Sequence, residues 1–162
     1  MSSLGIRPAP VKRTVVVKTD VARSFAAFTS RIGRWWPRSH SVSQTPQTDV
    51  IIEPRVGGRW YERGSDGSEC EWGKVLSWDP PGRLVLAWQL DANWQYDPSL
   101  VLEVEITFTA LEPGVTRVDL EHRNLEKYGD KATTVRDMLG SEKGWLGILK
   151  SFVADTEATQ GS

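Results

Sequence analysis

Cysteine is scarce in this sequence, since Cys70 is the only one among 162 residues. A single thiol excludes an internal disulfide and is typical of a protein from a reducing compartment. His40 and His122 are the only histidines, and no two of these three soft ligands have the spacing of a zinc site. We therefore expect no metal centre and no cofactor.

Strong charge of one sign is also missing, because the formal net charge is −1. Without a basic field the chain has little to attract nucleic acid or anionic lipid. No apolar run is long enough to cross a bilayer, and the first residues lack the apolar segment of a secretory signal. We expect a cytoplasmic protein, monomer or homodimer, with neither nucleic acid nor a membrane as its partner.

Sequence motifs of common catalytic and nucleotide-binding sites are absent as well. The chain has no Gly-x-Ser-x-Gly elbow, no Gly-x-Gly-x-x-Gly fingerprint and no phosphate-binding loop. The length predicts one domain. We place it at residues 13–158, after a flexible N-terminal arm at residues 1–12.

What the sequence does have is tryptophan, eight in all. Tryptophan is a large rigid ring whose single N–H needs a partner when it is buried. So many in one small domain indicate either a large core or a cavity with aromatic walls. The two alternatives remain open at this stage.

Periodicity predicts a strand, two short helices, six antiparallel strands and a long helix. Asp20 is the predicted cap of the first helix, and proline and glycine at 81 and 82 predict a type II turn between two strands. Residues 125–139 are ambiguous and could form a loop with a short helix. The predicted ranges are 12–18, 20–32, 34–36, 49–53, 57–63, 69–78, 83–88, 100–110, 115–124 and 140–158.

The last segment, residues 140–158, has the clearest helical pattern. Its apolar residues recur at helical spacing from Trp145 to Val153, and Ser141 is a plausible N-cap. Lys143, Lys150 and Glu157 fall on the opposite face. Strands 100–110 and 115–124 alternate cleanly, which predicts one dry sheet face for this helix to cover.

This order of elements resembles the helix-grip fold of the START-like, SRPBCC superfamily. Local motifs are similar to those of the activator of heat-shock-protein ATPase family. These motifs are Val56-Gly57-Gly58-Arg59-Trp60, Glu71-Trp72-Gly73-Lys74-Val75, Asp79-Pro80-Pro81-Gly82-Arg83 and Gly144-Trp145. The resemblance implies an α+β fold in which a curved antiparallel sheet wraps around a long C-terminal helix.

The resemblance also implies a cavity between sheet and helix, which in this superfamily often holds an apolar ligand. The loop around Trp94 and Tyr96 and residues 125–139 depart from the family and are expected at the cavity mouth. No residue is predicted to be catalytic. The cavity candidates are Phe28, Trp36, Trp60, Trp72, Trp88, Val104, Phe108, His122, Trp145, Leu149 and Phe152.

His122 shares the predicted core face with Val118 and Leu120 and has two interpretations. In the preferred one it lies partly exposed at the strand end, bonded to the backbone. In the other it projects into the cavity and bonds a ligand or acts as a general base.

The function that we expect is non-enzymatic binding of a small hydrophobic or aromatic ligand. One alternative is a co-chaperone-like interaction module, whose partner would be a chaperone. Another is a cyclase- or hydrolase-like enzyme that uses the same cavity.

Overall fold

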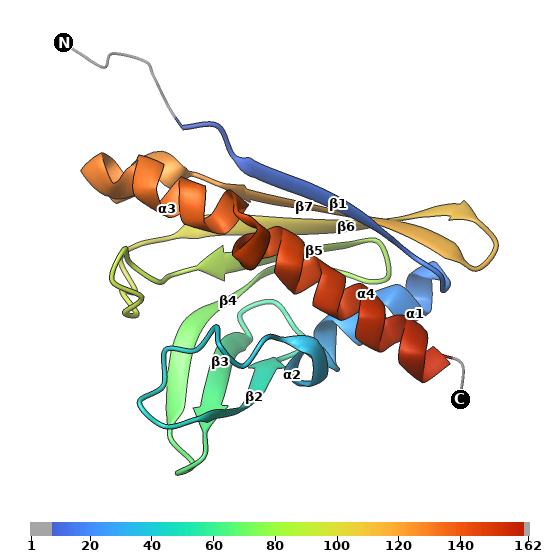
Figure 1. The fold of residues 1–162 in the computed structure, drawn as a ribbon, viewed down its shortest axis with the longest axis horizontal. Helices are drawn as coiled ribbons and strands as arrows, with labels where there is room; N and C mark the ends of the chain where they lie inside the picture. The colour runs from blue at the N-terminus through green and yellow to red at the C-terminus, as the bar shows by residue number, and fades with distance from the viewer. Residues whose placement is uncertain (1–7, 161–162) are drawn as a thin grey trace.

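The computed structural model describes residues 8–160, which fold around one curved antiparallel sheet (Figure 1). Its seven strands lie in the order β1-β7-β6-β5-β4-β3-β2, so the chain meanders from β2 to β7 while β1 pairs with β7. The strands are β1 (Val11–Val17), β2 (Gln47–Ile52), β3 (Arg59–Gly64), β4 (Glu69–Asp79), β5 (Arg83–Trp88), β6 (Leu102–Glu112) and β7 (Val115–Arg123).

Helices cover one face of this sheet (Figure 1). The two C-terminal helices, α3 and α4, follow one another along the chain and run across this face. The helical segments are α1 (Val21–Thr29), α2 (Ile32–Trp35), η1 (Leu125–Lys131), α3 (Ala132–Gly140), η2 (Glu142–Leu146) and α4 (Gly147–Gln160). Asp20 caps α1 as expected, because its carboxylate accepts from the Arg23 N–H at 2.7 Å. The predicted α+β helix-grip fold is confirmed.

The single predicted helix over residues 140–158 is wrong at its N-terminal end. Helix α3 ends at Gly140, Ser141 is extended, and α4 starts only at Gly147. Gly144 breaks the helix between them with φ −89° and ψ −136°, where a Cβ would collide with the Leu139 carbonyl. Ser141 does not act as a side-chain N-cap, and its hydroxyl instead donates to the Met138 carbonyl at 2.8 Å.

Three smaller predictions also need correction. The turn between β4 and β5 is closed by the Gly82 N–H on the Asp79 carbonyl, so Pro80 and Pro81 are its central residues and it is not the predicted type II turn. Residues 125–139 form η1 and α3 rather than a loop with a short helix. Strand β1 begins at Val11, two residues before the predicted domain boundary, and residues 1–7 of the predicted arm lie outside the described residues.

The core lies between the sheet and the helices. Leu102, Val104 and Ile106 of β6 are fully buried, and their alternation with half-exposed glutamates confirms the predicted dry and wet faces. From the other side, the α4 stripe contributes Leu149 and Phe152, both also fully buried. Helix α4 therefore covers a packed interior along most of its length.

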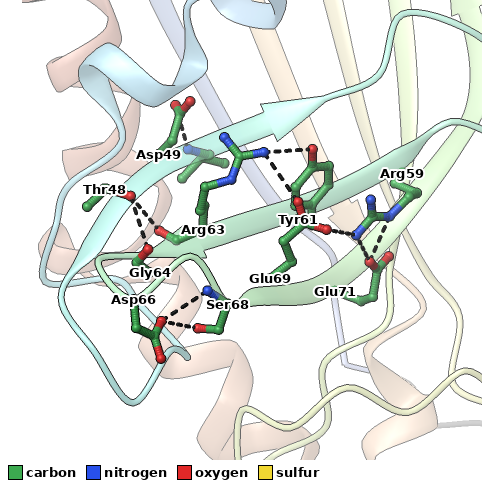
Figure 2. Close-up of polar contacts among 11 residues, drawn as sticks. Thr48, Asp49, Arg59, Tyr61, Arg63, Gly64, Asp66, Ser68, Glu69 and Glu71 are labelled. Carbon is green, nitrogen blue, oxygen red and sulfur yellow. Dashed lines mark hydrogen bonds and ion pairs between the residues drawn. The ribbon is translucent and has the colours of Figure 1, made fainter.

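The outer face of the sheet is held by charge pairs between strands. Figure 2 shows this face on β3 and β4, where Arg59 bonds Glu71 and Glu69 and Arg63 bonds Glu69. The Arg59 guanidinium lies 3.9 Å from the centre of the Tyr61 ring and covers it. The paired acids raise the pKa of Arg59 further above its ordinary value. This face therefore presents balanced charge to solvent.

No helix in the described part of the chain is long and apolar enough to span a membrane.

Candidate ligand-binding pocket

A cavity of about 430 Å³ opens where β4, β5 and the loop at residues 39–42 meet the α3–η2–α4 segment. This volume is within the range of small-molecule sites. The aromatic lining consists of Trp36, Trp72, Trp88, Trp94 and Trp145. The aliphatic lining consists of Val42, Leu90, Met138, Leu139 and Ile148, and the rest consists of Ser39, His40, Ser41, Ser141, Lys143 and Gly144.

The wall formed by Trp72 and the loop at residues 39–42 is fixed by a buried carboxylate. Glu62 is completely buried on β3, and its Oε1 accepts from the Val42 N–H at 2.6 Å and the Trp72 Nε1–H at 3.0 Å. Its Oε2 accepts from the Ser41 hydroxyl at 2.6 Å and the Gln47 amide at 3.4 Å. One acid therefore joins the loop to the sheet and sets the orientation of the Trp72 ring.

Trp36 and Trp88 are held in a similar way. The Trp36 N–H donates to the His40 carbonyl at 2.9 Å. The Trp88 N–H donates to the Tyr128 hydroxyl at 2.9 Å, which in turn donates to the Leu90 carbonyl at 2.7 Å. Burial raises the pKa of Tyr128, so its hydroxyl keeps its proton and both bonds.

Trp145 is oriented by His122, since its N–H donates to His122 Nδ1 at 3.0 Å. His122 is completely buried on β7, with its ring centre 4.8 Å from that of Trp88. Burial lowers the pKa of His122 to about 3, so the ring is neutral at pH 7. Because Nδ1 accepts, the proton lies on Nε2, which has no partner among the described residues.

This arrangement corrects the preferred interpretation of His122. The side chain is neither partly exposed nor bonded to backbone, because it lies in the interior and accepts from Trp145. The alternative with His122 as general base stays a prediction, and the hydrogen bond from Trp145 does not favour it. A neutral imidazole whose only basic nitrogen already accepts a bond has no free site for a proton.

These bonds leave the pocket walls apolar. The four buried tryptophans of the lining all use their N–H groups on protein acceptors. They therefore offer a ligand only ring faces and edges. The fifth, Trp94, is 36% exposed at the mouth, with its ring centre 6.2 Å from that of Trp88.

The structure brings together four of the residues predicted as cavity candidates. Trp36, Trp72, Trp88 and Trp145 line the pocket, whereas the others are buried in the core beside it. Those in the core are Phe28, Trp60, Val104, Phe108, His122, Leu149 and Phe152. A binding role for any of these candidates remains a prediction.

Sequence reasoning missed most of the polar lining and the role of Glu62. The two segments expected at the mouth do lie there, since Trp94, Met138 and Leu139 line the pocket. Lys143 was expected on the outer face of a helix, but the break at Gly144 places it in the lining instead. For residues 39–42 no periodic signal existed.

Among residues 8–160, no group of three or more His, Cys, Asp or Glu side chains is arranged so that it could hold a metal ion. Cys70 is partly buried on β4. Burial raises the pKa of this thiol, so it is protonated at neutral pH.

Comparison with known proteins gives one family and many similar structures. The family model described as "Activator of Hsp90 ATPase homolog 1-like protein" matches residues 18–155. The solved structure of Txn09, an anthrahydroquino-gamma-pyrone synthase complexed with SUM, is 38% identical, with a TM-score of 0.65 over 91% of this chain and 96% of that chain. CalC from Micromonospora echinospora, a self-sacrificing resistance protein, is 32% identical, with a TM-score of 0.71 over 93% and 96% of the two chains.

A more distant match adds to the fold alone. The Aha1 dimer from Colwellia psychrerythraea is 16% identical, with a TM-score of 0.61 over 93% of this chain and 97% of that chain. No curated protein matched the sequence.

Proposed function

The chain belongs to the family of Activator of Hsp90 ATPase homolog 1-like proteins, and on that premise we propose that it binds a planar aromatic ligand in the tryptophan-lined pocket. The observation that carries the proposal is the wall itself. Five indole rings surround one cavity, and the four buried ones have no N–H left to offer. Such a wall favours a flat apolar ring system over a sugar or nucleotide.

The energetics fit a ligand of about three fused rings. Burying roughly 200 Å² of apolar surface contributes about 5 kcal/mol at 25 cal/mol per Å². Edge and stacking contacts with indole rings add roughly 0.5–1.5 kcal/mol for each pair. Association costs of about 4 kcal/mol or more are subtracted from this sum, so we expect a dissociation constant between millimolar and micromolar.

One of the two relatives supports the same ligand class. The name of Txn09 describes a synthase of a polycyclic aromatic product, and that protein is 38% identical to this chain. CalC, at 32% identity, is described as a resistance protein. The lining of the pocket in this chain contains no aspartate or glutamate.

The test is a titration of the protein with anthracene-2-carboxamide, followed by quenching of tryptophan fluorescence and by calorimetry. Met138 is 41% exposed at the mouth, so Met138→Trp adds bulk there without disturbing the core. We expect about tenfold weaker binding, a loss of about 1.4 kcal/mol. Leu111→Trp, at a 50% exposed position outside the lining, is the matched control and should bind normally. No saturable binding by the unmodified protein would refute the proposal.

A second candidate is catalysis on the bound ligand, which the 38% identity to a named synthase favours. The reaction class is ring closure of a phenol onto a side-chain ketone, with loss of water. Incubation with a hydroxyanthraquinone that carries a 1,3-diketone side chain, followed by mass spectrometry, tests it. A product 18 mass units lighter, formed faster than without protein, would favour the enzyme over the carrier. The co-chaperone alternative rests on the family description alone and is not proposed.

A further inference from the structure

Polar groups of the pocket gather on one side of its mouth. Two segments meet there, the loop with Ser39, His40 and Ser41 and the turn η2 with Lys143. They are joined by a 2.5 Å hydrogen bond between His40 Nε2 and the Lys143 carbonyl oxygen. The rest of the lining is almost entirely apolar, so a bound ligand meets polar groups mainly along this edge.

Most of these groups are already bonded within the protein. The Ser41 hydroxyl donates to Glu62 at 2.6 Å, and the Ser141 hydroxyl donates to the Met138 carbonyl at 2.8 Å. The Ser39 hydroxyl pairs with His40 Nδ1 at 3.1 Å, which leaves the His40 ring with both nitrogens bonded. These hydroxyl and imidazole groups are therefore not free to donate a hydrogen bond to a ligand on this side.

Lys143 is the exception, and it is the only lysine, arginine, aspartate or glutamate in the lining. It is exposed, and none of the ion pairs found among residues 8–160 includes it. Glu62 does not line the pocket, and its carboxylate already accepts bonds from the loop and from Trp72. A positive charge thus stands at the mouth of an apolar pocket without a negative partner in its lining.

We propose that the pocket takes a polycyclic aromatic ligand with an anionic edge, a carboxylate or a phenolate, and that Lys143 binds this edge at the mouth. The inference rests on the proposed binding of an aromatic ligand and adds the charge of that ligand. The rings lie against the tryptophan wall, and the anion stays at the wet rim beside the ammonium. In this orientation neither the ligand charge nor Lys143 has to leave water completely.

The experiment compares two probes of the same shape, anthracene-2-carboxylate and anthracene-2-carboxamide, by calorimetry at low ionic strength. The unmodified protein should bind the carboxylate about fivefold more tightly, as a rim ion pair in water allows. Lys143→Gln should abolish this preference by weakening the carboxylate complex, while Lys143→Arg should retain it. Lys150→Gln removes one charge from the exposed side of α4, outside the lining, and should keep the preference.

The outcomes separate this inference from the proposed function. Equal affinity for the two probes, or a preference that survives Lys143→Gln, overturns the role of Lys143 while aromatic binding stands. Failure of both probes to bind overturns the proposed function and this inference together.

Discussion

Glu62 gives the sharpest test of how the pocket is built. It is fully buried and accepts four hydrogen bonds. Two of the donors, the Val42 N–H and the Trp72 Nε1–H, have no other acceptor among residues 8–160. Glu62→Ala leaves both without a partner, at about 1–3 kcal/mol each, and opens a small cavity. We expect a loss of about 3–5 kcal/mol in the free energy of unfolding.

Glu62→Gln separates the charge of this side chain from its shape. The amide oxygen can still accept from Val42 and Trp72, and the Ser41 hydroxyl can rotate to accept from the new NH₂ group. The Gln47 amide loses its weak 3.4 Å bond, and the charge-assisted part of the other bonds is lost, so we expect a cost of about 1–2 kcal/mol.

The assay is urea denaturation at neutral pH, followed by far-UV circular dichroism. Glu121→Gln on the outer face is the control, because its two ion pairs span 3.7 and 3.9 Å, and it should change stability by less than about 0.5 kcal/mol. If Glu62→Ala costs no more than Glu121→Gln, the carboxylate does not hold the wall. A Glu62→Gln protein more stable than the unmodified one would mean that the buried charge destabilises the fold.

Two further predictions concern the pocket's back wall and its turn. His122 has a pKa lowered by burial from 6.5 to about 3, so below pH 6.5 the unfolded chain binds a proton that the folded chain does not. The stability that neutral His122 contributes is complete above pH 6.5 and is lost as the pH falls, by about 2 kcal/mol at pH 5. Urea titrations at pH 7.5 and pH 5 should show this loss in the free energy of unfolding. His122→Gln should lack this part of the pH dependence. Gly144→Ala should lower the free energy of unfolding by about 1–3 kcal/mol, because the new Cβ meets the Met138 and Leu139 carbonyls. Gly82→Ala, at a position with open space around it, should be nearly neutral in the same urea titrations. The packing would be contradicted if His122→Gln kept the full pH dependence of stability, or if the two glycine variants had equal stability.

The sheet and its dry face could be predicted because alternation along a strand is a local property of the sequence. The register from Leu102 to Phe108 is an example, since each inward residue is apolar and each outward one polar. The helix break at Gly144 could not be predicted in this way. Ser141 and Glu142 have the composition of a helix start, and only the backbone carbonyls of α3 show why the chain must turn there.

The pocket itself was harder to predict, because its lining comes from segments far apart in the sequence. Ser41 and Lys143 lie 102 positions apart, and nothing in the residues between them indicates that they share a rim. Glu62 was missed since an acid on an alternating strand usually faces water. It can be buried here because four donors from three separate segments converge on it.

The central claim, that a planar aromatic ligand binds within the tryptophan wall, is tested most directly by NMR of the indole N–H groups. Tryptophans outside the pocket serve as internal controls. Five tryptophans line the pocket, namely Trp36, Trp72, Trp88, Trp94 and Trp145, whereas Trp35, Trp60 and Trp78 do not. In a ¹⁵N-tryptophan sample titrated with anthracene-2-carboxamide, ring currents should shift the lining signals, and those of Trp35 and Trp78 should stay in place. Shifts confined to Trp78, or no shifts at saturating probe, would contradict the account.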